Sequence, residues 1–218
     1  MNLPADLLPH WLLYLGLVLY LAGTLAALVL APWRALSRPT ILNLSLAASA
    51  ALIVLWRLEA GLLPGLSFHF LAVTAATLLL GWSLAVLATL VAELTLTLIG
   101  GGSFVAFGIN GLLSGLLPAS LTYLLYRLYR RQFPQHLFVY IFAVAFLGGA
   151  IVAVVNACIR FSILASNGAY TVDRLTSEYL PLLPLYAFPE AVLNGMLVTI
   201  FAVFRPDWVK TLHRDTRF

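Results

Sequence analysis

The sequence predicts an all-α, polytopic membrane helix bundle. Hydrophobic residues make up 62% of the 218 residues, and charged residues make up only 9%. A soluble domain carries roughly 25% charged residues, and a chain of this length cannot bury so much apolar surface in its own core. The composition therefore excludes a water-soluble globule. We expect a single integral membrane domain over residues 1–218, with no room for a soluble domain beside it.

Seven membrane-spanning helices are expected from the apolar runs. A crossing needs about 20 apolar residues, and the run over residues 66–99 is far longer than one ~30 Å crossing. Gly81-Trp82-Ser83 is the only break in that run, so we divide it there into two helices. The predicted helices are residues 8–30, 41–56, 66–80, 83–99, 111–128, 137–164 and 185–204.

Basic residues predict the orientation of these helices. Nine of the twelve Lys and Arg residues follow the first, fifth and seventh predicted helices. Seven spans place these three clusters on one face, which the positive-inside rule makes cytoplasmic. We therefore expect the N-terminus outside and the C-terminus inside. The net charge of +4 is then a topology signal and does not indicate nucleic acid as a partner.

Five polar residues fall inside predicted spans, where such side chains usually face a partner or a cavity. These residues are Glu93, Asn156, Arg160, Glu190 and Asn194. A spacing of four places Asn156 and Arg160 on one helix face, and Glu190 and Asn194 on another. We predict an ion pair between Arg160 and Glu190, which lie at similar depth on the sixth and seventh helices. The pair is explained either as a link between these helices or as part of a ligand site.

Two histidines are expected at the outer ends of helices, on the same side as the amino group of Met1. They are His10 and His69. Imidazole and amine nitrogens suit nickel, cobalt, copper or zinc. His10 is equally explained as an interfacial residue beside Trp11, and His69 as a buried histidine without a ligand.

The stretch from Gly100 to Gly111 is the most distinctive in the chain. Three successive glycines disfavour a helix, yet apolar residues follow them. Irregular backbone at membrane depth is tolerated where it is buried in protein or lines a cavity. We interpret the segment as an outer re-entrant loop that caps a cavity, with Asn110 pointing inward; a plain tight turn is the alternative.

Several short motifs occur together in this chain. Gly101-Gly102 is followed by Gly108-Ile109-Asn110 at the start of a helix, and His69 precedes an apolar segment ending in Leu79-Leu80-Gly81-Trp82. Pro189 and Gly195 stand six residues apart, and the chain begins Met1-Asn2-Leu3-Pro4. In these features the chain resembles the CbiM- and NikM-like subunits, the cobalt/nickel substrate-binding components of energy-coupling factor transporters.

The resemblance implies a metal site built from the N-terminal amine of Met1, the residue at position 2 and His69. The family has histidine at the second position, where this chain has Asn2. The chain also departs from the family pattern at Ala187 and Asn194. His10, Glu93 or Glu190 could complete a different site for a divalent metal.

The resemblance further implies a substrate-binding or permease subunit, not an enzyme, that takes up a divalent transition metal such as nickel or cobalt. It would be a multi-pass protein of the inner (plasma) membrane. Its expected partners are a transmembrane coupling subunit and ATP-binding subunits on separate chains, since this chain has no P-loop. Two alternatives stay open: a scaffold subunit without a ligand site, and an intramembrane hydrolase that combines His69 with Ser67 or Ser103.

Overall fold

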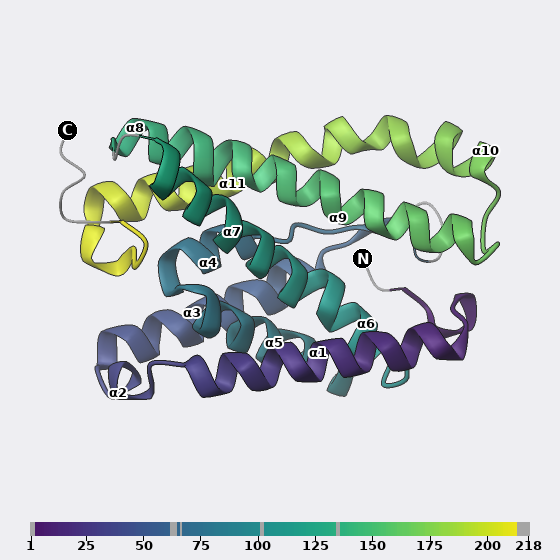
Figure 1. Cartoon of the computed structure of the whole chain (residues 1–218), viewed down its shortest axis with the longest axis horizontal. Helices are drawn as coiled ribbons and strands as arrows, with labels where there is room; N and C mark the ends of the chain where they lie inside the picture. Colours follow the sequence, from purple (N-terminus) through teal and green to yellow (C-terminus); the bar gives the residue numbers. More distant parts are fainter. Residues whose placement is uncertain (1–2, 62–64, 66, 101–102, 134–135, 213–218) are drawn as a thin grey trace.

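The computed structural model of the chain describes residues 3–61, 65, 67–100, 103–133 and 136–212. Long helices lie side by side along the longest axis of the molecule (Figure 1). The principal helices are α1 (His10–Leu30), α2 (Trp33–Leu36), α3 (Pro39–Arg57), α4 (Val73–Leu80), α5 (Trp82–Leu98), α6 (Phe107–Gly111), α7 (Leu117–Gln132), α8 (Leu137–Val139), α9 (Leu147–Ser166), α10 (Val172–Arg174) and α11 (Leu183–Phe204). Short 3₁₀ turns cover Ala5–Leu7, Leu180–Leu182 and Pro206–Trp208.

Five helices in the described part of the chain are long and apolar enough to cross a membrane. They are His10–Leu30, Pro39–Arg57, Phe107–Gln132, Leu137–Ser166 and Val172–Phe204. The shorter apolar helix α5 packs among them. Large apolar side chains such as Leu25 and Val29 are exposed on the outside of the bundle, where lipid rather than water is the favourable solvent. The predicted fold class is confirmed: this is an all-α, multi-pass membrane protein.

Three of these spans contain a π-helical turn that joins two α-helical parts. The turns are Leu112–Leu116, Tyr140–Phe146 and Leu175–Tyr179. The first joins α6 to α7, so the fifth predicted helix begins four residues earlier than expected, at Phe107. The last span begins at α10 rather than at residue 185. The glycines of the stretch from Gly100 to Gly111 predicted a loop, but the backbone is helical from Phe107 onward, because tertiary packing overrides helix propensity.

The predicted break at Gly81 is confirmed. Gly81 ends α4 with a positive φ of 80°, a conformation that an L side chain rarely adopts, and α5 begins at the next residue. The predicted third helix over residues 66–80 is only partly correct. Its first part is a short hairpin strand, β2 (Ser67–Phe68), paired antiparallel with β1 (Ala60–Gly61), followed by non-helical residues up to α4. An eight-residue helix is only about 12 Å long, so α4 alone does not cross a membrane.

α4 lies inside the bundle, and all eight of its residues are buried. It packs against α5, α7 and α11. The three segments that carry the basic clusters (α2, the end of α7, and the segment after α11) gather at one end of the molecule in Figure 1, which we call the α2 end. The opposite end carries α10. The non-helical segment before α4 approaches the interior from the α10 side.

Candidate metal-binding region

His69 lies in the non-helical segment between β2 and α4, and it is 4% exposed. Its Nδ1 atom is 3.1 Å from the carbonyl oxygen of Phe70. A carbonyl oxygen can only accept, so Nδ1 carries the proton and Nε2 keeps its lone pair. Burial lowers the pKa of His69 well below its usual value, because the charged imidazolium loses its hydration. His69 is therefore a neutral imidazole with a nitrogen available to bind a metal.

The indole of Trp56 fixes the surroundings of this histidine. The ring centroids of Trp56 and His69 are 5.6 Å apart, and Trp56 Nε1 donates a 3.1 Å hydrogen bond to the carbonyl oxygen of Leu71. Trp56 lies near the end of α3, so it connects that helix to the non-helical segment. The segment is buried yet irregular, which is possible because neighbouring side chains satisfy its backbone groups.

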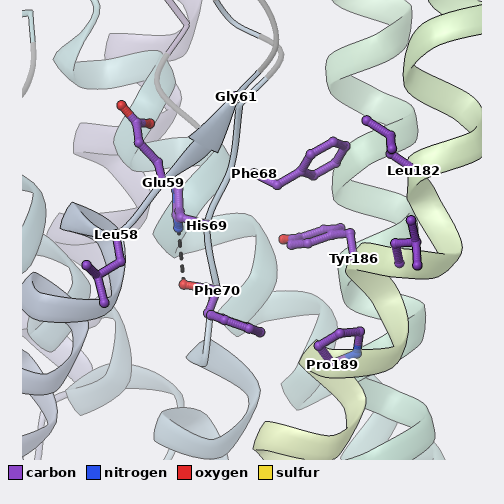
Figure 2. Close-up of a pocket in the computed structure, with 10 residues that line it drawn as sticks. Leu58, Glu59, Gly61, Phe68, His69, Phe70, Leu182, Tyr186 and Pro189 are labelled. Atoms are coloured by element: carbon purple, nitrogen blue, oxygen red, sulfur yellow. Dashed lines mark hydrogen bonds between the residues drawn. The ribbon is translucent and has the colours of Figure 1, made fainter.

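A pocket of about 600 Å³ opens beside His69. Its walls come from the two residues after α3, the hairpin with the following His69 and Phe70, and the beginning of α11. Figure 2 shows Tyr186 and Pro189 of α11 facing the segment that holds His69 and Phe70. The lining is mostly apolar, with Glu59 at its edge. The hydroxyl of Tyr186 is buried and has no hydrogen-bond partner in the described part of the chain.

Asn110 is buried in α6, and its side chain holds the N-terminal segment. Its Oδ1 accepts a 2.8 Å hydrogen bond from the backbone N–H of Leu3, and its Nδ2 donates to the carbonyl oxygen of Leu3 at 3.2 Å. Leu3 itself is fully buried. The side chain therefore points inward, and it fixes the chain directly after Met1 and Asn2. Those two candidate ligands, like Gly101 and Gly102, lie outside the described residues.

Gly108 belongs to α6 rather than to a loop. A Cβ on Gly108 would collide with the backbone of Leu17, and one on Gly16 would lie 2.8 Å from the Cβ of Ile109. These glycines let α1 and α6 approach closely. Phe104 and Val105 of the preceding segment are exposed, and the described pocket is lined by other segments. The prediction that this stretch caps a cavity is therefore not confirmed for its described residues. Asn110 instead attaches the N-terminal segment through Leu3.

Glu190 binds the beginning of α4. Its two carboxylate oxygens accept hydrogen bonds from the backbone N–H groups of Leu71 (2.9 Å) and Ala72 (2.7 Å). Asn194, one turn later on α11, donates to Glu190 Oε1 at 2.8 Å and accepts from the backbone N–H of Ala75 at 2.7 Å. A carboxylate at a helix N-terminus is favoured by the unpaired N–H groups and by the helix dipole.

The predicted ion pair between Arg160 and Glu190 is wrong. Arg160 Nε donates to Asn156 Oδ1 at 2.8 Å, and its Nη2 donates to Ser114 Oγ at 2.9 Å. Glu190 instead accepts hydrogen bonds from the backbone at the start of α4, which packs against α11. The spacing argument correctly joined Asn156 to Arg160 and Glu190 to Asn194.

Two further candidates occupy different environments. Glu93 is buried on α5 and interacts electrostatically with Arg160. His10 is exposed at the first residue of α1. Within the described ranges, no three His, Cys, Asp or Glu residues come together as a metal site. Of the two candidate histidines, His69 is buried and His10 is exposed.

Several residues of this region carry no signal in the sequence. Tyr186 and Ser114 carried no signal, because a single Tyr or Ser in an apolar helix is ordinary. The end of the described chain was also missed: Lys210 and Thr211 donate backbone hydrogen bonds to the carbonyl oxygens of Leu79 (3.0 Å) and Leu78 (3.2 Å). These residues satisfy the end of α4.

The geometry defines a multi-pass membrane protein with a buried histidine in an irregular segment directly before the buried helix α4. Comparison with known families identifies it further. The chain belongs to the CbiM family, described as the cobalt uptake substrate-specific transmembrane region, whose model matches residues 2–208. It is therefore a transport component of the cobalt-uptake type. No curated protein and no solved structure matched in the corresponding comparisons.

Proposed function

We propose that this chain is the metal-binding component of an energy-coupling factor transporter and captures a divalent transition metal, cobalt in the first place. The observation that carries this proposal is His69, which is buried and pairs its Nδ1 with the carbonyl oxygen of Phe70, so that Nε2 remains to bind a metal. Membership of a cobalt-uptake family supports the class of substrate. Nickel is the second candidate, because both metals accept imidazole and amine nitrogens.

The remaining ligands are proposed to come from the N-terminal segment. Asn110 anchors Leu3. The groups that come directly before this anchored residue are the amine of Met1 and the backbone and side chain of Asn2. At position 2 the side chain of Asn2 offers an amide oxygen where the family's histidine offers an imidazole nitrogen. The amide oxygen is the harder donor of the two. His10, Glu93 and Glu190 are weaker candidates: His10 is exposed, and Glu190 already accepts three hydrogen bonds.

We further propose that the end carrying α10 faces outward and that the α2 end, with its basic clusters, faces the cytoplasm. The inner membrane is the proposed location. Transport would need a transmembrane coupling subunit and ATP-binding subunits on separate chains. In this arrangement His69 receives the metal from outside, and the energy for its release inward comes from those partners.

The test is the metal content of the purified full-length protein, measured by elemental mass spectrometry after loading with cobalt or nickel. The parent chain should bind about one metal ion, and His69→Ala should lose it. His10→Ala is the matched control, since it removes an exposed histidine, and it should bind as the parent does. Absence of metal in the loaded parent would contradict the proposal and favour a scaffold role.

A further inference from the structure

α4 is a buried helix whose two ends are both satisfied by one continuous stretch of chain. A helix leaves unpaired N–H groups at its start and unpaired carbonyl groups at its end. Within a membrane protein these groups need protein partners. α11 supplies the partners at the start through Glu190 and Asn194. The segment directly after α11 supplies them at the end.

The contacts at the end of α4 centre on Thr211. Its backbone N–H and its Oγ1 both donate to the carbonyl oxygen of Leu78, at 3.2 Å and 2.8 Å. Since the hydroxyl proton of Thr211 is used in this bond, Tyr140 must donate the 2.6 Å hydrogen bond between its hydroxyl and Thr211 Oγ1. Lys210 adds a backbone bond to Leu79, and its side chain packs at the Gly81 break.

This arrangement links the two ends of the bundle. His69 stands four residues before the first residue of α4, and Glu190 accepts hydrogen bonds from the backbone N–H groups of two of the three residues between them. α4 is a stiff, wholly buried unit, so a shift at its end is transmitted to its start. Arg205, Pro206 and Asp207 are exposed, which leaves the segment before Thr211 accessible from the α2 end.

We propose that Thr211 is a positioning residue for the metal site: through α4, it sets the position of the segment that carries His69 and thereby the affinity for the metal. The link to affinity rests on the proposed function, whereas the link to position does not. A partner that moves the segment after α11 would lower the affinity of His69 for its metal from the opposite end of the bundle.

The variants separate this role from simple stabilisation. Thr211→Val removes both hydroxyl hydrogen bonds while it keeps the shape of the side chain. Thr211→Ser keeps both bonds and is the rescue variant. Tyr140→Phe removes the bond from Tyr140 and leaves the bond to Leu78, so it is the matched control.

The first readout is independent of metal. Ser67→Cys places a thiol at the half-buried β2 strand beside His69, in a Cys158→Ala background, and its rate of maleimide labelling reports the position of that segment. Ser177→Cys, an exposed site at the same end, is the reference. Thr211→Val should change the Ser67→Cys rate about fivefold and leave the Ser177→Cys rate unchanged. Thr211→Ser and Tyr140→Phe should stay within about twofold of the parent.

The second readout is the cobalt affinity of the full-length protein by titration calorimetry, well below the melting temperature. Thr211→Val should weaken binding about fivefold to tenfold at unchanged stoichiometry, and Thr211→Ser should restore it. The proposal would be overturned if Thr211→Val lowered the melting temperature but left the labelling rate unchanged. It would also be overturned if the parent bound cobalt and Thr211→Val bound it with the same affinity. If the parent binds no cobalt, the proposed function fails, and the labelling rates still decide whether Thr211 positions the segment.

Discussion

Two helix contacts in the interior of this protein are built by opposite means. α1 meets α6 through glycines, with no room for a side chain between Gly108 and the backbone of Leu17. α4 meets α11 through hydrogen bonds, in which Glu190 and Asn194 satisfy the backbone at the start of α4. The first contact depends on shape and the second on polar groups. The first should therefore fail when volume is added, and the second when an acceptor is removed.

The largest effect is expected from Glu190→Ala. The substitution leaves the N–H groups of Leu71 and Ala72 and one N–H of Asn194 buried without an acceptor, and each such group costs about 1–3 kcal/mol. We expect a loss of about 4 kcal/mol in the free energy of unfolding, measured by SDS titration in mixed micelles. The cobalt affinity should fall as well, because the segment of His69 loses its anchor.

Glu178→Ala is the matched control for that variant. Glu178 pairs with Arg174 at 3.1 Å on the surface, and an exposed pair contributes about 0–1 kcal/mol. A Glu190→Ala protein as stable as the Glu178→Ala protein would show that the carboxylate does not hold α4.

Gly108→Ala should have the second largest effect. The added methyl group meets the backbone of Leu17, which cannot rotate away as a side chain can, so the two helices must separate. We expect a destabilisation of about 3 kcal/mol in the same titration. Gly148→Ala is the matched control in another helix. A Cβ there would lie 3.6 Å from its nearest neighbour, so alanine should stabilise by about 1 kcal/mol through its better helix propensity.

Asn110→Ala combines both kinds of contact, because Asn110 belongs to the shape-based α6 but acts by hydrogen bonding. Its removal leaves the N–H and carbonyl of Leu3 without partners, at a cost of about 2 kcal/mol. Cobalt binding should weaken more than tenfold, since the N-terminal ligands are no longer fixed. Asn167→Ala removes a half-buried amide that follows α9 and donates to the carbonyl oxygen of Ile163 in that helix at 2.7 Å; it should leave binding unchanged. Equal cobalt affinities of Asn110→Ala and Asn167→Ala would show that Asn110 does not contribute to the metal site.

Five of the seven predicted spans correspond to helices long and apolar enough to cross a membrane, because hydropathy is a local property of the sequence. The span predicted over residues 83–99 is the shorter helix α5, and the one over residues 66–80 is helical only in α4. Gly81 was identified as a break, and the helix it divides was assigned in two parts. The irregular residues before α4 could not be foreseen, because they are apolar and their partner Glu190 lies 119 residues further along the chain. The sequence shows that Glu190 and Asn194 share a face, but not which element that face meets.

For the candidate site, the structure bears on the burial of its residues, whereas metal binding stays a prediction. Asn110 and His69 were singled out from motif and position, and the structure places both in the interior. The bond from Asn110 to Leu3 spans 107 residues, and no periodicity in either segment indicates it. The proposed pair of Arg160 and Glu190 failed for the same reason: depth follows from the sequence, whereas the neighbour in the bundle depends on packing.

The smallest effect is expected from Gly100→Ala. Gly100 has a φ of 80°, but no atom of the described residues lies within 4 Å of the position that a Cβ would take. Its cost is therefore conformational and amounts to about 1 kcal/mol, without the packing term that Gly108→Ala carries. Asn at this position tolerates a positive φ better than Ala does, so Gly100→Asn should recover part of the loss in the SDS titration. If Gly100→Ala destabilised the protein as much as Gly108→Ala does, the turn after α5 would have to pack against protein. The two glycines would then not differ in being required for conformation and for close approach, respectively.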